Sequence, residues 1–185
     1  FMEGMAGFGT AVAIPASMLA GLGFAPIPAV LLCLLANGVP TPYGSIGIPT
    51  VSLAGLVGLD SAHLAFVQMV QLAPFYIVAP FLIVLVAGKV EGASIADRLR
   101  GVVVPTLVSG LAFTLPTMAV AAFVGPELSV VVGSICALAV TALLAMRAEH
   151  SGKLDERFHV AVEPHEALTL GGALRAWSCF ILIFI

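Results

Sequence analysis

Charged residues are scarce in this chain of 185 residues. Asp, Glu, Lys and Arg together make up 9% of the sequence, whereas an ordinary soluble domain contains about 25%. Hydrophobic residues make up 61%, the mean hydropathy is +1.16, and apolar runs of transmembrane length recur. This composition excludes a soluble globular domain and predicts an all-α, polytopic membrane protein.

The chain also has few of the residues from which enzymes, metal sites and nucleic-acid interfaces are built. Its three cysteines, Cys33, Cys136 and Cys179, fall in apolar stretches without metal-ligand spacing, so we expect them to be packing residues. No basic patch interleaved with aromatic residues suggests a nucleic-acid partner. No Ser-His constellation or pair of catalytic Asp residues lies within the apolar spans. We therefore expect a protein that is not an enzyme and that uses neither a cofactor nor a metal.

The two ends of the sequence do not resemble the ends of a complete protein. The chain begins at Phe1 rather than Met, and it stops within the apolar run 180–185. We therefore expect a fragment of a longer chain, with the missing remainder and the lipid bilayer as its partners.

The most unusual stretch runs from Asn37 to Thr50, where three prolines, three glycines and four hydroxyl side chains interrupt apolar sequence. Inside a membrane, the backbone can leave a helix only where it is buried in protein or lines a wet cavity. Carriers use such breaks as binding sites, because the freed amides and carbonyls can coordinate a substrate. The pattern therefore predicts a discontinuous transmembrane helix over residues 26–59.

Glycines also interrupt the first ten residues, so we expect no continuous helix there. An apolar arm, Ala11–Leu22, follows Thr10, which is a plausible N-cap. Each short arm spans ~15–18 Å, which is too little to cross a hydrocarbon core of ~30 Å. The sequence thus predicts a re-entrant hairpin over residues 1–25, with its first arm truncated. We expect residues 7–10 to face the broken stretch near the middle of the membrane.

The rest of the chain alternates between long apolar runs and charged loops. We expect Asp60 to cap the first run, and Pro74 and Pro80 to kink it. Full spans are expected over residues 61–87, 101–123 and 126–148, a further span begins at 173–185, and charged loops occupy 88–100 and 149–172. All seven Lys and Arg residues lie in or beside these two loops. The positive-inside rule makes both loops cytoplasmic, with Asp60 and Gly125 outside.

Several strings resemble the L-lactate permease family. The most specific is Glu3-Gly4-Met5-Ala6-Gly7-Phe8-Gly9-Thr10, and others are Tyr43-Gly44, Gly47-Ile48-Pro49, Gly125-Pro126-Glu127-Leu128 and Ala176-Trp177. The departures are Ala11, where a proline is usual, and Pro15. The resemblance implies a carrier of the bacterial inner membrane that transports lactate and related 2-hydroxy monocarboxylates by proton symport. It also implies a fold with re-entrant hairpins and broken helices, as in inverted-repeat carriers. A channel with a glycine-rich filter, or a carrier of another small organic anion, is the alternative.

The candidate site combines glycines, which let the backbone approach a ligand, with neutral donors. Because the spans lack Lys and Arg, a substrate carboxylate would rest on amides and hydroxyls in this part of the chain. The predicted substrate-binding residues are Gly7, Gly9, Thr10, Asn37, Thr41, Tyr43, Gly44, Ser45 and Gly47. Alternatively, the glycines pack helices closely and the polar side chains satisfy the unwound backbone. Gln68 and Gln71 are expected to form interhelical hydrogen bonds.

Glu3 is the only acidic residue among the first 59. A carboxylate in the membrane interior costs at least ~2.5–3.5 kcal/mol, so we expect it to be neutral, hydrated or partnered. This predicts a proton-coupling residue. The alternatives are that Glu3 lies at a water-exposed edge or stabilises the glycine-rich bend.

Overall fold

The computed structural model describes residues 1–7, 9–87 and 94–150. These residues form helices and no strand, which confirms the all-α prediction. The elements are α1 (Met2–Met5), α2 (Thr10–Gly21), α3 (Pro26–Gly38), the 3₁₀ turn η1 (Thr41–Tyr43), α4 (Gly44–Val57), α5 (Ser61–Ala87), α6 (Ile95–Leu99), α7 (Val103–Phe123) and α8 (Pro126–His150). The predicted loop over 149–172 lies almost wholly outside the described residues, and the span beginning at 173 lies entirely outside them.

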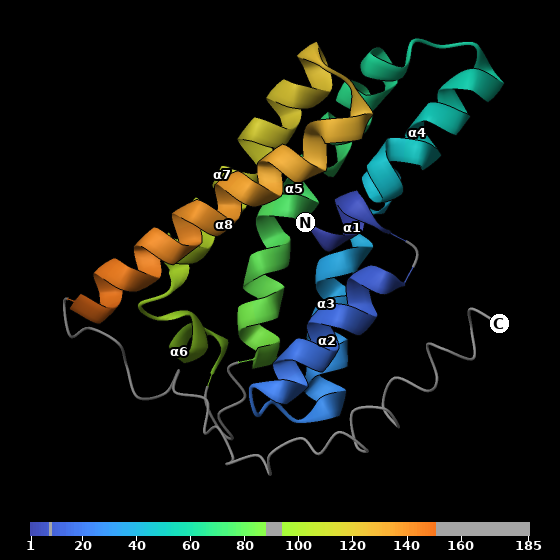
Figure 1. Ribbon diagram of the computed structural model, residues 1–185. Coiled ribbons are helices and arrows are strands. Elements are labelled where there is room, and N and C mark those ends of the chain that lie inside the picture. Colours follow the sequence, from blue (N-terminus) through green and yellow to red (C-terminus); the bar gives the residue numbers. More distant parts are fainter. Residues whose placement is uncertain (8, 88–93, 151–185) are drawn as a thin grey trace, which may run out of the picture.

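Three helices, α5, α7 and α8, are long and apolar enough to cross a membrane. A fourth candidate is the bent pair formed by α3 with η1 and α4, whose two parts meet at 72°. The predicted span 61–87 coincides with α5, whereas α7 begins later than the predicted residue 101, at Val103. Figure 1 shows α5, α7 and α8 as a group, with α2 and α3 side by side next to them and α4 above α2 and α3 in this view.

Small residues bring the long helices into close contact. A Cβ atom added to Gly110 of α7 would lie 3.2 Å from the Cα atom of Ile77 on α5. One added to Gly133 of α8 would lie 2.8 Å from the carbonyl oxygen of Phe113 on α7 and would overlap the Thr117 hydroxyl. Lipid supplies no hydrophobic drive between helices, so close packing of this kind stabilises the bundle.

The hydroxyl side chains of α7 find partners inside the bundle. Thr106, Thr114 and Thr117 each donate to the carbonyl four residues earlier, at 2.6–2.7 Å. The Ser109 and Thr141 hydroxyls lie 2.8 Å apart and join α7 to α8. These bonds matter because the hydrocarbon region offers no competing partner.

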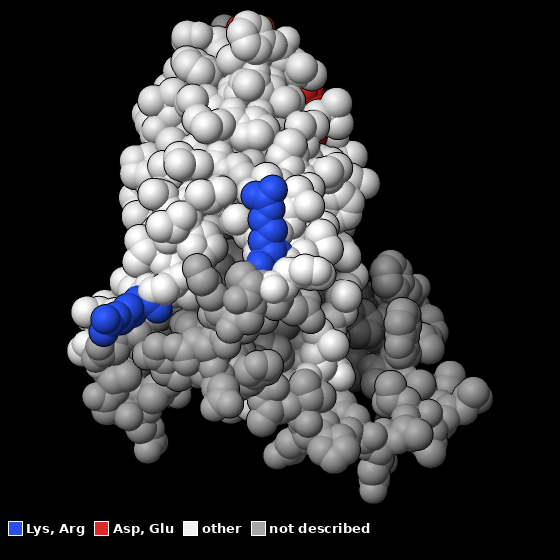
Figure 2. Space-filling view, turned by 90° about the vertical axis from the view of Figure 1, so that its left-hand side faces the viewer, with Lys and Arg blue, Asp and Glu red and all other residues white. Residues whose placement is uncertain are grey.

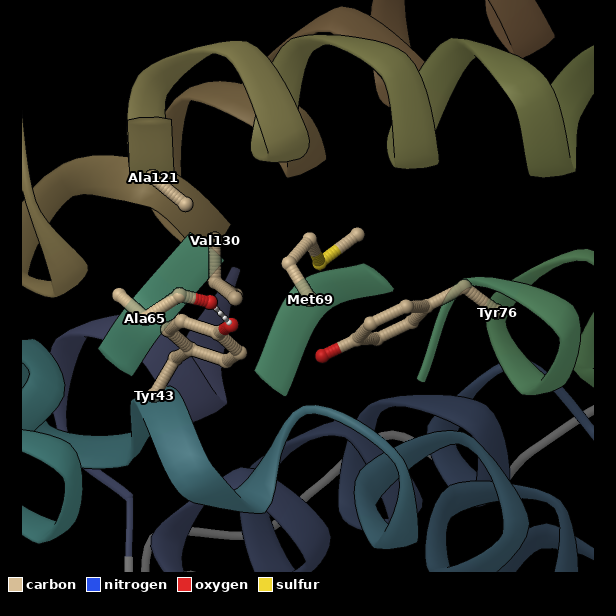
Figure 3. Packing of buried hydrophobic residues seen from close by; sticks show 6 residues of the cluster. All are labelled: Tyr43, Ala65, Met69, Tyr76, Ala121 and Val130. Atoms are coloured by element: carbon tan, nitrogen blue, oxygen red, sulfur yellow. Dashed lines mark hydrogen bonds between the residues drawn. The ribbon is translucent and has the colours of Figure 1, made fainter. Parts of the chain in front are cut away.

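A buried cluster fastens the broken stretch to the long helices. It consists of Tyr43, Ala65, Met69, Tyr76, Ala121 and Val130, drawn in Figure 3, and thus joins η1, α5, α7 and α8. The Tyr43 side chain is fully buried, and its hydroxyl donates to the Ala65 carbonyl at 2.6 Å. η1 is therefore held against the second turn of α5.

The start of α2 differs from the sequence prediction. Gly9, with φ of 97°, is the N-cap, and Thr10 is the first helical residue and makes no side-chain capping bond. The left-handed conformation at the cap is one that glycine adopts without steric cost and threonine does not. The prediction that Thr10 caps this helix was therefore wrong. Asp60, by contrast, accepts the His63 amide at 2.8 Å, which confirms it as the cap of α5.

Charges separate along the molecule. Asp60 and Glu127 lie at the starts of α5 and α8, whereas Arg100 lies just before α7 and Arg147 in the last turn of α8. Figure 2 shows the Lys and Arg side chains on the lower part of the molecule and the Asp and Glu side chains near the top. Arg100 and Arg147 thus lie at the opposite end from these two acidic residues.

Candidate functional site

Helix α4 opens with a left-handed turn. Ser45, Ile46 and Gly47 have φ of 47°, 60° and 74°, and right-handed helix resumes at Ile48. Left-handed backbone costs residues with a Cβ roughly 1–2 kcal/mol each, and for a β-branched residue such as Ile46 it is an outlier. Backbone held in such a conformation often marks a functional site. The proline- and glycine-rich stretch is therefore broken at η1 and at this turn.

Helix α1 lies directly against the break. A Cβ atom added to Gly7 would lie 2.5 Å from the Ser45 hydroxyl oxygen, and one added to Gly44 would overlap the Glu3 carboxyl group. The Ser45 hydroxyl donates to the carbonyl of Ala6 at 2.8 Å. Only glycine fits at position 7, where φ is +54° and a Cβ atom would also lie 2.9 Å from the Ser45 backbone nitrogen, whereas a side chain at position 44 would displace the Glu3 carboxyl group. Of residues 7–10, which were expected to face the broken stretch, Gly7 thus lies against it.

The start of α8 packs against both α1 and the break in α4. A Cβ atom on Gly4 would lie 3.1 Å from a methyl carbon of Val131. One on Gly47 would lie 2.9 Å from the carbonyl carbon of Pro126. We call the meeting of α1, the α4 break and the start of α8 the glycine junction, after Gly4, Gly7, Gly44 and Gly47.

Glu3 is the acidic residue of the glycine junction. Its side chain is 6% exposed, and its Oε2 atom is buried with no hydrogen-bond partner among the described residues. No Lys or Arg precedes Lys89 in the sequence. An isolated carboxylate is costly in such surroundings, so this group is suited to take up a proton or to bind a cation.

The predicted site residues fall into two sets. The glycine junction brings together Glu3, Gly7, Gly44, Ser45 and Gly47. Gly9 and Thr10 are exposed instead, and a Cβ atom on Gly9 would meet nothing within 4 Å. The amides of Thr10, Val12 and Ala13 donate to the carbonyls of Gly7 and Gly9. The start of α2 therefore offers a ligand fewer free amides than the sequence suggests.

Polar side chains between α3 and α4 form hydrogen bonds with the backbone, which limits what they can offer a ligand. The Thr41 hydroxyl lies 3.1 Å from the Asn37 carbonyl and 3.2 Å from the Gly38 carbonyl. The Tyr43 hydroxyl is committed to α5. The Oδ1 atom of Asn37, however, is buried without a partner among the described residues. Of these three side chains, Asn37 alone keeps a buried polar atom available to a ligand.

Comparison with known proteins identifies the family. The family model described as L-lactate permease matches residues 1–185. This chain belongs to the L-lactate permease family. It is 45% identical over 143 residues to the L-lactate permease of Streptococcus iniae, covering 77% of this chain and 29% of that protein. Against the L-lactate permease of Escherichia coli (strain K12), identity is 32% over 191 residues, covering 99% of this chain and 33% of that protein.

The chain is also similar to a permease that is named for a different substrate. The chain is 27% identical over 200 residues to the glycolate permease of Escherichia coli (strain K12), covering 100% of this chain and 34% of that protein. The chain thus spans about a third of the length of the curated relatives it matches. No solved structure matches it.

In this member of the L-lactate permease family, the break lies nearer one end of the bundle than expected. Tyr43 bonds to Ala65, five residues after Asp60, and packs with Val130 near the start of α8. At 1.5 Å per residue, this level is ~6–8 Å from the starts of α5 and α8. We expected the break near the middle of the membrane because the apolar arm before it is short. Helix α3, which forms this arm, continues to Gly38, and η1 prolongs it.

Two further polar residues, one beside the break and one farther along α5, were not predicted as site residues. The Thr50 hydroxyl lies 2.7 Å from both the Pro42 carbonyl and Oε1 of Gln68. A hydroxyl has one hydrogen, so one of these contacts requires the Gln68 amide to be turned with its NH₂ toward Thr50. This contact agrees with the interhelical bond predicted for Gln68, whereas Gln71 is exposed. The second residue is Tyr76, whose position between Pro74 and Pro80 was the signal available in the sequence.

Proposed function

We propose that the complete protein is a secondary active transporter of lactate and related small 2-hydroxy monocarboxylates, working by proton symport in the bacterial inner membrane. Family membership and the names of the relatives support the substrate class. The observation that carries the mechanism is the buried, unpaired carboxyl oxygen of Glu3 against the break in α4. Proton-coupled transport needs a group that can carry a proton, and the glycine junction places such a group against a break in α4.

Glu3 is the proton-coupling residue in this proposal. With no Lys or Arg in the first 88 residues, a proton is the simplest way to neutralise its carboxylate inside the membrane. Protonation also turns one carboxyl oxygen into a donor, which changes what the group can bind. Release of that proton leaves a charge beside Gly44 and thereby favours a rearranged junction.

Neutral donors bind the substrate carboxylate in this proposal. The left-handed turn at Ser45, Ile46 and Gly47 departs from the right-handed helical pattern, and backbone amides at such a break are the candidate donors to the carboxylate. The helix that resumes at Ile48 adds the positive end of its dipole, ~+0.5 of an elementary charge. The Ser45 hydroxyl, now donating to Ala6, would exchange that carbonyl for the substrate.

The charge distribution supports one orientation of the protein in the membrane. Arg100 and Arg147 lie at one end of the bundle, and Asp60 and Glu127 lie at the other. By the positive-inside rule, the first end is cytoplasmic. The α4 break then belongs to the outer half of the membrane, nearer the side from which lactate enters the cell.

The test uses proteoliposomes that contain the complete protein. An inwardly directed proton gradient should drive accumulation of radiolabelled lactate, and counterflow should proceed without the gradient. Glu3→Gln should abolish accumulation and retain some counterflow, because the amide cannot carry a proton. Asp60→Asn, the same chemical change at the exposed cap of α5, should accumulate lactate normally, because asparagine caps a helix as well as aspartate does.

Two outcomes would contradict the proposal. Normal accumulation by Glu3→Gln would remove this residue from proton coupling. Uptake by the unaltered protein that does not saturate, shows no counterflow and gives large single-channel currents would instead indicate a channel.

A further inference from the structure

We infer that Tyr76 is a specificity residue whose hydroxyl binds the 2-hydroxyl group of the transported acid, an inference that rests on the proposed function. Its ring lies in the buried cluster and is 4% exposed. Its hydroxyl oxygen is buried and has no hydrogen-bond partner among the described residues. A phenylalanine would fill the same space without leaving a polar atom unpaired, so the hydroxyl requires a reason to be there.

The other tyrosine of the cluster makes the contrast clear. Tyr43 is equally enclosed, but its hydroxyl donates to the Ala65 carbonyl at 2.6 Å. The fold can therefore satisfy a buried tyrosine hydroxyl in this cluster by using a helix carbonyl. Figure 3 shows the Tyr76 hydroxyl turned toward the side on which Tyr43 lies, which is the side of η1 and the break.

The backbone around Tyr76 is also short of hydrogen bonds. Pro80 has no amide hydrogen, so the Tyr76 carbonyl loses its usual helical donor four residues later. This carbonyl faces α7, where a Cβ atom on Gly110 would lie 3.5 Å from it. Tyr76 is the sixteenth of the 27 residues of α5 and thus lies close to the middle of the helix. Carriers bind substrates near the middle of the membrane, where unpaired polar groups mark function.

The surroundings of Tyr76 select the kind of group that it binds. Its ring packs on Phe113, with centroids 5.0 Å apart, and Met69 belongs to the same cluster. These neighbours are apolar, and a bare charge among them would be costly, whereas a neutral hydroxyl is tolerated once it is hydrogen-bonded. Tyr43, in the same cluster, directly precedes Gly44 of the glycine junction. Tyr76 lies eleven residues beyond Ala65 on α5, or about 16 Å, so in this proposal the acid presents its 2-hydroxyl to Tyr76 after it has moved inward from the break.

The experiment compares lactate with propionate, which lacks the 2-hydroxyl, as competitors of counterflow by the complete protein. Tyr76→Phe should weaken the affinity for lactate by about 5- to 150-fold, because the substrate hydroxyl is left unpaired. The affinity for propionate should stay the same or improve. Phe113→Leu, which alters the packing of the ring but leaves its hydroxyl, should lower stability and preserve the ratio between the two acids.

A second measurement guards against poor folding of the variant. In detergent, lactate should raise the melting temperature of the unaltered protein more than that of Tyr76→Phe at the same concentration. Unchanged lactate affinity in Tyr76→Phe, or equal weakening for lactate and propionate, would overturn the assignment of Tyr76. The absence of lactate counterflow from the unaltered protein would instead overturn the proposed function, so the two failures are distinguishable.

Discussion

Replacing Ile46 by glycine tests the left-handed turn that breaks α4. Ile46 has φ of 60° and ψ of 40°, a conformation that glycine adopts without steric cost. The substitution removes a penalty of roughly 1–2 kcal/mol and adds the entropic cost of glycine, about 0.5–1 kcal/mol. The substitution also removes side-chain contacts, which lowers the free energy of unfolding by a separate amount. A matched variant with the same loss of contacts isolates the backbone effect.

Ile48→Gly is that control. The two isoleucines are 49% and 54% exposed, so the loss of each side chain costs a similar amount. Ile48, however, lies where α4 is already right-handed, so glycine there relieves no strain. Ile46→Gly should therefore be more stable than Ile48→Gly by about 1–2 kcal/mol in its free energy of unfolding.

Reversible unfolding in mixed detergent micelles containing increasing SDS would measure this difference. The two variants share the same background and the same chemical change, so errors of extrapolation largely cancel. Equal destabilisation of both variants would mean that residue 46 has ordinary helical backbone. The left-handed turn, and the anion site built on it, would then have to be abandoned.

Three further predictions concern the glycine junction and the orientation of the protein in the membrane. Gly47→Ala should destabilise the protein more than Gly9→Ala, because both have positive φ but only Gly47 meets another backbone, and thermal unfolding would compare them. Ser45→Ala should weaken the affinity for lactate about 10- to 150-fold, because a hydrogen bond to a charged group is lost. Thr10→Val should have a smaller effect, because Thr10 is exposed. Counterflow measures both affinities. Cysteine at position 94, in a background without the native cysteines, should be inaccessible to an impermeant maleimide added outside; external labelling would reverse the assigned direction.

Local sequence determined much of the fold because membrane helices follow from local rules. The span 61–87 could be predicted from an uninterrupted apolar run after an aspartate cap, and α5 has the same limits. Prolines and glycines likewise located the break, since each disturbs the backbone at its own position. The prediction for Thr10 failed because a glycine one residue earlier accepts the left-handed cap.

The candidate site depended more on contacts between distant residues. The meeting of Glu3 with Gly44, or of Gly4 with Val131, is fixed by packing between elements that the sequence does not place relative to one another. Tyr76 was missed for the same reason, because a tyrosine becomes notable only when its hydroxyl is found buried and unpaired. The level of the break along α5 and α8 likewise depends on packing, since the Tyr43 contacts set it.

The contact of Gly47 with Pro126 has a mechanical consequence. It joins backbone to backbone, since glycine has no side chain and the nearest atoms of Pro126 include its carbonyl carbon and oxygen. Side-chain contacts can absorb movement by changing rotamer, but a main-chain contact has no such slack. A movement of α4 about its break would therefore press on the first turn of α8. Because α7 and α8 are closely packed, that push is delivered to the helical hairpin as a whole, which then acts as a lever.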